Sequence, residues 1–154
     1  MGSERRQREM TTMVPVTKVR QKDIPGLELA KGMSTQYNVC QETVGSKFLK
    51  MGVCTHAPDM ADLKWTANAE EAFYIAKGSI KVIWRSDGGE GGETVVREGE
   101  QVFLPKGYHY ILRATGEPAI NVFAVAGDPP DIESIHGAEA AGQLKTAAAQ
   151  LRNA

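Results

Sequence analysis

Short apolar runs alternate with glycine, proline and aspartate between residues 14 and 127, and many of these runs have a period of two. In residues 47–53, for example, Leu49, Met51 and Val53 share one face of an extended chain. Further strands are expected over residues 71–76, 79–85, 94–97, 101–104, 108–113 and 119–125. Strands spaced by about 8–12 residues, with turn signals between them, are typical of a β-sandwich or barrel.

The chain changes character after residue 127. Two prolines at 129 and 130 end the strand pattern, and the tail from 131 to 154 is rich in alanine. A sparse apolar stripe in this tail predicts a weakly amphipathic helix, interrupted by Gly137 and Gly142. We expect it to pack on the barrel or on a second subunit. At the other end, residues 1–13 are polar and predict a flexible N-terminal arm.

Composition narrows the class of protein. A chain of 154 residues suits one domain. With 18 basic and 19 acidic residues, its net charge of −1 argues against nucleic acid as a partner. No apolar run reaches the ~18–20 residues that span a bilayer, so no membrane association is expected. Two cysteines, Cys40 and Cys54, without a secretory signal suit a reducing compartment, and we expect a cytoplasmic protein.

Two motifs bracket the middle of the chain. In the first, Glu71 is followed after six residues by Gly78; in the second, Gly99 is followed after five residues by Pro105-Lys106-Gly107. Glycine permits a sharp turn between strands, and Pro-x-Gly sets a turn at a barrel rim. This pair of motifs resembles the two motifs of the cupin superfamily. The resemblance implies an all-β fold: a single cupin jelly-roll β-barrel over residues 14–127, here followed by a C-terminal α-helix.

The same resemblance implies where a metal would bind. Metal-binding cupins usually carry His-x-His before the glutamate and a third histidine after Pro-x-Gly. The corresponding positions hold Lys64 and Thr66 in one register, Trp65 and Ala67 in the other, and Tyr110 in place of the third histidine. Of the four ligands, Glu71 alone remains, and one carboxylate with a phenol binds a divalent ion weakly. We therefore expect neither a metal of the usual kind nor another cofactor.

A closer resemblance rests on the segment Trp65-Thr66-Ala67-Asn68-Ala69-Glu70-Glu71, with Gly78 and Pro105-Lys106-Gly107. It is similar to the barrel domain of the ethanolamine-utilisation protein Q family, whose members also lack His-x-His. This resemblance implies a link to ethanolamine catabolism and a homodimer. An acetate-kinase-like role has been proposed for that family, but these residues contain no recognisable nucleotide-binding loop.

Cupin geometry implies that Glu71 and Tyr110 point into the barrel cavity. Burial beside aromatic rings would raise the pKa of the Glu71 carboxyl group, as is needed for a general acid or base. We expect Glu71, Tyr110 and His109 as candidate catalytic residues. The candidate residues for binding a small molecule are Trp65, Thr66, Phe73 and Tyr108. A cationic amine could pair with Glu71 and stack on an aromatic ring.

Three functions stay open at this point. The first is a metal-independent enzyme acting on a small molecule such as an amine, with Glu71 as acid or base. The second is a non-catalytic dimeric module that binds a ligand or acts as a scaffold. The third is a metalloenzyme with unusual ligands, Glu71, His109 and His56, which would require a bulge that turns His109 inward.

Overall fold

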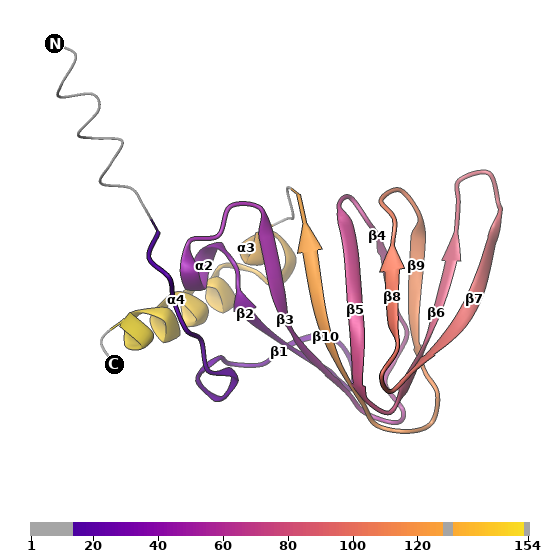
Figure 1. Cartoon of the computed structure of the whole chain (residues 1–154), viewed down its shortest axis with the longest axis horizontal. Coiled ribbons are helices and arrows are strands. Elements are labelled where there is room, and N and C mark those ends of the chain that lie inside the picture. The colour runs from indigo at the N-terminus through magenta and orange to yellow at the C-terminus, as the bar shows by residue number, and fades with distance from the viewer. Residues whose placement is uncertain (1–13, 128–130, 153–154) are drawn as a thin grey trace, which may run out of the picture.

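The computed structural model describes residues 14–127 and 131–152, in which the strands form two antiparallel sheets (Figure 1). The six-stranded sheet has the order β1 (Leu27–Ala30), β2 (Met33–Val39), β3 (Leu49–His56), β10 (Ala119–Ala126), β5 (Glu70–Lys77) and β8 (Gln101–Leu104). The four-stranded sheet has the order β4 (Leu63–Thr66), β9 (His109–Ala114), β6 (Ser79–Arg85) and β7 (Gly91–Arg97). The predicted all-β jelly roll is confirmed. The predicted arm, residues 1–13, lies outside the described residues.

The main core lies between the two sheets. Alternation along β5 and β6 turns Ile75, Ile80 and Val82 inward, and each is almost completely buried. Removing one such side chain from water stabilises the fold by about 1.5–3 kcal/mol. The chain passes from the larger sheet to the smaller one at Gly78, the single residue between β5 and β6.

Helices complete the fold beside the larger sheet. They comprise a 3-10 turn η1 (Gln21–Asp23), a short helix α2 (Gln41–Val44), and the tail helices α3 (Ile132–His136) and α4 (Ala138–Arg152). The tail helices lie beside β2 and β3, at the opposite end of the molecule from β6 and β7 (Figure 1). Ile132 and Leu144 are fully buried in a second core that includes Tyr37 of β2. The predicted C-terminal helix is thus confirmed, packed on the barrel.

The two expected interruptions of the tail have different outcomes. The helix does break at Gly137, which has a φ of 94° between α3 and α4. At Gly142, however, α4 continues without a break, so that expectation is wrong. A glycine inside a helix costs about 1 kcal/mol. Burial of the nearby Leu144 and Ala148 against the fold exceeds this cost.

Strand β3 turns polar Lys50 and His56 inward. Leu49 and Met51 share one face as predicted, but this face is the outer one and both side chains are exposed. The buried face of β3 carries Lys50, Cys54 and His56 instead. Exposed Tyr74 and Phe103 on β5 and β8 extend the apolar outer surface. The homodimer stays a prediction.

Among the described residues, no helix has the length and apolar character needed to cross a membrane.

Candidate functional site

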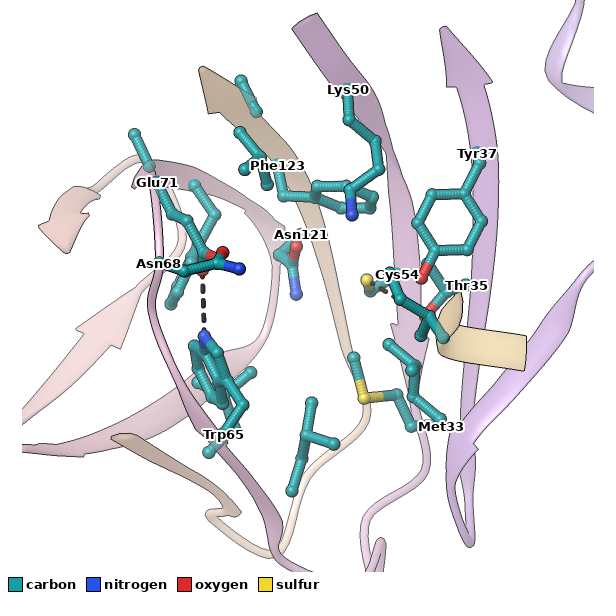
Figure 2. Close-up of a pocket in the computed structure, with 18 of the residues that line it drawn as sticks. Met33, Thr35, Tyr37, Lys50, Cys54, Trp65, Asn68, Glu71, Asn121 and Phe123 are labelled. Atoms are coloured by element: carbon teal, nitrogen blue, oxygen red, sulfur yellow. Dashed lines mark hydrogen bonds between the residues drawn. The ribbon is translucent and has the colours of Figure 1, made fainter. Parts of the chain in front are cut away.

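A cavity of about 260 Å³ opens into the barrel (Figure 2). Its walls come from β1, β2, β3, β10 and β5 of the larger sheet, from β4 and β9 of the smaller one, and from Ile135 of the tail helix α3. Most of the lining is apolar or aromatic, including Trp65, Phe73 and Phe123. A concave apolar site with few polar groups is the usual form of a small-molecule site.

Strand pairing arranges the cavity floor in rows across three strands. In one row, Val125 of β10 lies between Lys50 of β3 and Glu71 of β5, and all three side chains point to the same face. In the next row, Phe123 occupies the corresponding position beside Phe73. Neighbouring strands are about 4.8 Å apart, so the Cα atoms of Lys50 and Glu71 are separated by roughly 10 Å. The sheet register therefore places one acid and one base at the same level of the cavity.

Glu71 is held by the indole of Trp65. The Trp65 Nε1–H donates a hydrogen bond of 3.1 Å to Glu71 Oε2, and this bond bridges the β4 and β5 walls (Figure 2). Burial raises the pKa of the Glu71 carboxyl group, while the Trp65 hydrogen bond and the positive charge of Lys50 oppose this rise. A carboxyl group in this state can pair with a cation or exchange a proton with a bound molecule.

Lys50 is a cavity residue that the sequence pattern did not single out. It is only 7% exposed, and its Nζ lies 5.6 Å from the centroid of the Tyr37 ring. Burial lowers the pKa of its ammonium group, and the charge of Glu71 acts in the opposite direction. Lys50 shares the less apolar face of β3 with Gly52 and Cys54, at a spacing of two residues. This spacing is the sequence signal that could have identified Lys50. That face was overlooked because Leu49 and Met51 are more hydrophobic.

Deeper in the barrel, Asn121 of β10 links the cavity to a buried histidine. The His56 Nδ1 lies 2.9 Å from Met60 Sδ, and its Nε2 lies 2.5 Å from Asn121 Nδ2. A thioether can only accept a hydrogen bond, so Nδ1 carries the ring proton and Nε2 accepts from the Asn121 amide. The Asn121 Oδ1 is consequently the atom turned away from His56. It is buried and has no hydrogen-bond partner among the described residues.

The predicted site residues divide into two groups. Glu71, Trp65, Thr66 and Phe73 border the cavity, although the Thr66 hydroxyl bonds His109 Nδ1 at 2.7 Å. Tyr110 was expected to point into the cavity and orient Glu71, but it is buried in the core and does not border the cavity. Its hydroxyl donates to the Pro105 carbonyl at 2.6 Å. The backbone at the turn thus satisfies the phenol, and Trp65 contacts the Glu71 carboxylate instead.

Two further candidates also lie away from the cavity. His109 is exposed on the outer face of β9, where its Nε2 lies 2.5 Å from Asp87 Oδ1. Tyr108 is half-buried and packs against the Tyr110 ring with a centroid distance of 6.1 Å. Neither residue borders the cavity.

The donors beside Glu71 do not fit the metal that the cupin resemblance implies. In the His-x-His positions, the structure turns Trp65 and Ala67 inward and leaves Lys64 and Thr66 exposed. The alternative ligands do not converge, because His109 is on the outer face and the His56 nitrogens bond Met60 and Asn121. Within the described part of the chain, no group of three His, Cys, Asp or Glu side chains could hold a metal ion.

Comparisons with known proteins agree with this geometry at the level of the fold. A mutant of Bacillus subtilis oxalate decarboxylase is 21% identical, with a TM-score of 0.66, and the match covers 80% of this chain. The chain spans about a third (33%) of that protein. The EutQ protein of Clostridium difficile is 22% identical, with a TM-score of 0.50, over 72% of this chain and 81% of its own.

Another similar structure is a putative ethanolamine utilization protein q from Salmonella typhimurium, 21% identical with a TM-score of 0.50. That match covers 63% of this chain and 71% of the other. None of the curated proteins matches the sequence. The sequence model of the family described as Cupin matches residues 53–148, which is more than half of the chain. The chain therefore belongs to the cupin family.

Proposed function

We propose that the barrel cavity binds a small organic amine without a metal ion, and that Glu71 receives the ammonium group. The observation that carries this proposal is the Glu71 carboxylate, which faces an aromatic cavity and is oriented by the Trp65 indole. A cation pairs with such a carboxylate and is also attracted to the face of a tryptophan ring. A bound ammonium group would contact the Glu71 carboxylate in place of the water that burial excludes.

The likeness to the two ethanolamine-utilisation structures supports an amine as the ligand class. Ethanolamine is small enough for a cavity of about 260 Å³. We propose ethanolamine as the first ligand to test and amine catabolism as the process in which the protein acts. Acid–base chemistry by Glu71 on the bound amine is the catalytic form of this proposal, because a raised pKa brings a carboxyl group closer to neutral pH.

A second candidate function is a non-catalytic dimeric binding module. The apolar outer surface formed by Leu49, Met51, Tyr74 and Phe103 favours it, since exposed apolar patches often mark protein interfaces. Both candidates share the amine site. Formation of a product from the bound amine distinguishes the enzyme from the module.

Replacing Glu71 by glutamine should weaken ethanolamine binding by about tenfold or more, because a charge-assisted hydrogen bond is replaced by a neutral one. The change keeps the shape of the side chain and its bond from Trp65. Isothermal titration calorimetry on the full chain measures the affinity. The same loss should appear as a smaller ligand-induced rise in melting temperature.

Glu70→Gln is the matched control, because Glu70 is the preceding residue on β5 and its side chain is exposed. This variant should bind ethanolamine as the wild type does. Equal affinity of the wild type and the Glu71→Gln variant, or equal loss in both variants, would show that Glu71 does not receive the ammonium group.

A further inference from the structure

The cavity presents a fixed positive group as well as a fixed negative one. Lys50 and Glu71 enter it from opposite sides, in the same row of the sheet, with Val125 between them (Figure 2). Both side chains belong to regular strands of one sheet, so their separation is set by backbone pairing rather than by a loop. Roughly 10 Å between their Cα atoms leaves room for a ligand that contacts each group with a different end.

A second buried group favours a ligand end that carries N–H donors. Asn121 is 2% exposed, and its Oδ1 has no hydrogen-bond partner within the described residues. The proton on His56 Nδ1 fixes the orientation of this amide, since Nε2 must then accept from Asn121 Nδ2. In Figure 2 the oxygen points toward the part of the cavity that Lys50 and Glu71 enter. An unsatisfied buried oxygen of this kind is stabilised by a ligand N–H.

Resting on the proposed amine site, we propose that the ligand is a short zwitterion: its ammonium group binds Glu71 and Asn121 Oδ1, and its carboxylate binds Lys50. The Lys50 Nζ, beside the Tyr37 ring, supplies the charge that a carboxylate needs in a mostly apolar cavity. A ligand with a few carbon atoms between its two charges suits groups that enter from opposite sides, on strands whose Cα atoms are roughly 10 Å apart. The cavity holds roughly nine water volumes, which suits an ω-amino acid of this length.

A different role for Lys50 makes a distinct prediction. If Lys50 only compensates the charge of Glu71, its removal changes the affinity for the zwitterion and for the plain amine by the same factor. If Lys50 binds the ligand carboxylate, its removal weakens the zwitterion and leaves the plain amine much less affected. The ratio of the two affinities therefore separates a ligand-binding role from a supporting one.

The experiment compares 4-aminobutanoate, butylamine and butanoate by calorimetry on the full chain. All three probes contain four carbon atoms. 4-Aminobutanoate carries both charges, butylamine only the positive charge, and butanoate only the negative charge. We expect the wild type to bind 4-aminobutanoate about tenfold or more tightly than butylamine, because a second charge pair forms away from water. In Lys50→Met this preference should fall to about twofold or less, and in the exposed control Lys77→Met it should persist.

If the wild type binds 4-aminobutanoate and butylamine with equal affinity, the proposal that the ligand is a zwitterion is wrong, whereas the proposed amine site is not contradicted. This result needs no variant, so the test survives if Lys50→Met fails to fold. An unchanged preference in a folded Lys50→Met variant would overturn the role of Lys50. If butanoate binds but butylamine and 4-aminobutanoate do not, both the zwitterion and the proposed amine function are wrong.

Discussion

Lowering the pH from 6.5 to about 4 should remove about 3 kcal/mol of folding stability through His56 alone. Burial lowers the pKa of the His56 imidazole to about 4, and its side chain is 1% exposed. The folded state therefore binds fewer protons than the unfolded state throughout this range. The neutral ring stabilises the fold fully above pH 6.5, and this contribution is lost as the pH falls toward 4.

Urea unfolding at a series of pH values measures this effect. In a His56→Gln variant, stability should change much less between pH 6.5 and 4, whatever its value at neutral pH. His109→Gln is the control, because it removes an exposed histidine of the outer face and keeps His56, so the loss of stability that His56 causes should remain. A His56→Gln profile that overlays the wild-type profile would show that His56 is not kept neutral by the fold.

Replacing Gly78 by alanine should destabilise the protein by about 3 kcal/mol or more. Gly78 has a φ of 74°, in the left-handed region that disfavours a side chain. A Cβ atom there would also lie 2.0 Å from the Pro118 carbonyl oxygen. The chain changes sheets at this residue, so neither β5 nor β6 can shift without disturbing its partners. The midpoint of urea unfolding reports the loss.

Gly99→Ala separates the effect of the positive φ from the effect of a steric clash at the Cβ atom. Gly99 is the first glycine of the second motif and has a φ of 84°, but a Cβ atom at this position would meet nothing within 4 Å. This variant should therefore lose only the backbone contribution, about 1–2 kcal/mol. If both alanine variants lose the same stability, the close approach to Pro118 contributes nothing and the steric explanation for Gly78 is wrong.

Much of the β fold could be predicted because alternation and turns are local signals. The strands expected at residues 79–85 and 101–104 have the same limits as β6 and β8. Strands β1 and β2 were missed because their buried faces include polar Thr35, so no clear apolar alternation marks residues 27–39. The period of two shows which residues share a face, but packing against the rest of the sheet decides which face is buried.

The candidate site could likewise be predicted only in part from the sequence. The Glu71–Gly78 motif led to the cavity, and Trp65 and Phe73 border it as expected. Lys50 was missed because its strand turns its polar face inward, and this choice depends on pairing with β10. The resemblance implies that Tyr110 points into the cavity, whereas it is buried in the core. Its hydrogen bond to Pro105 is a tertiary contact that the spacing of the motif does not encode.

A crystal structure of the full chain soaked in ethanolamine tests the amine site most directly. The account predicts ligand density in the barrel cavity, with its nitrogen about 2.7–3.2 Å from a Glu71 carboxylate oxygen and beside the Trp65 ring. The same soak of the Glu71→Gln variant should leave the cavity without the amine. A cavity that holds only water in the wild type at saturating ethanolamine, or an amine bound elsewhere, would contradict the account.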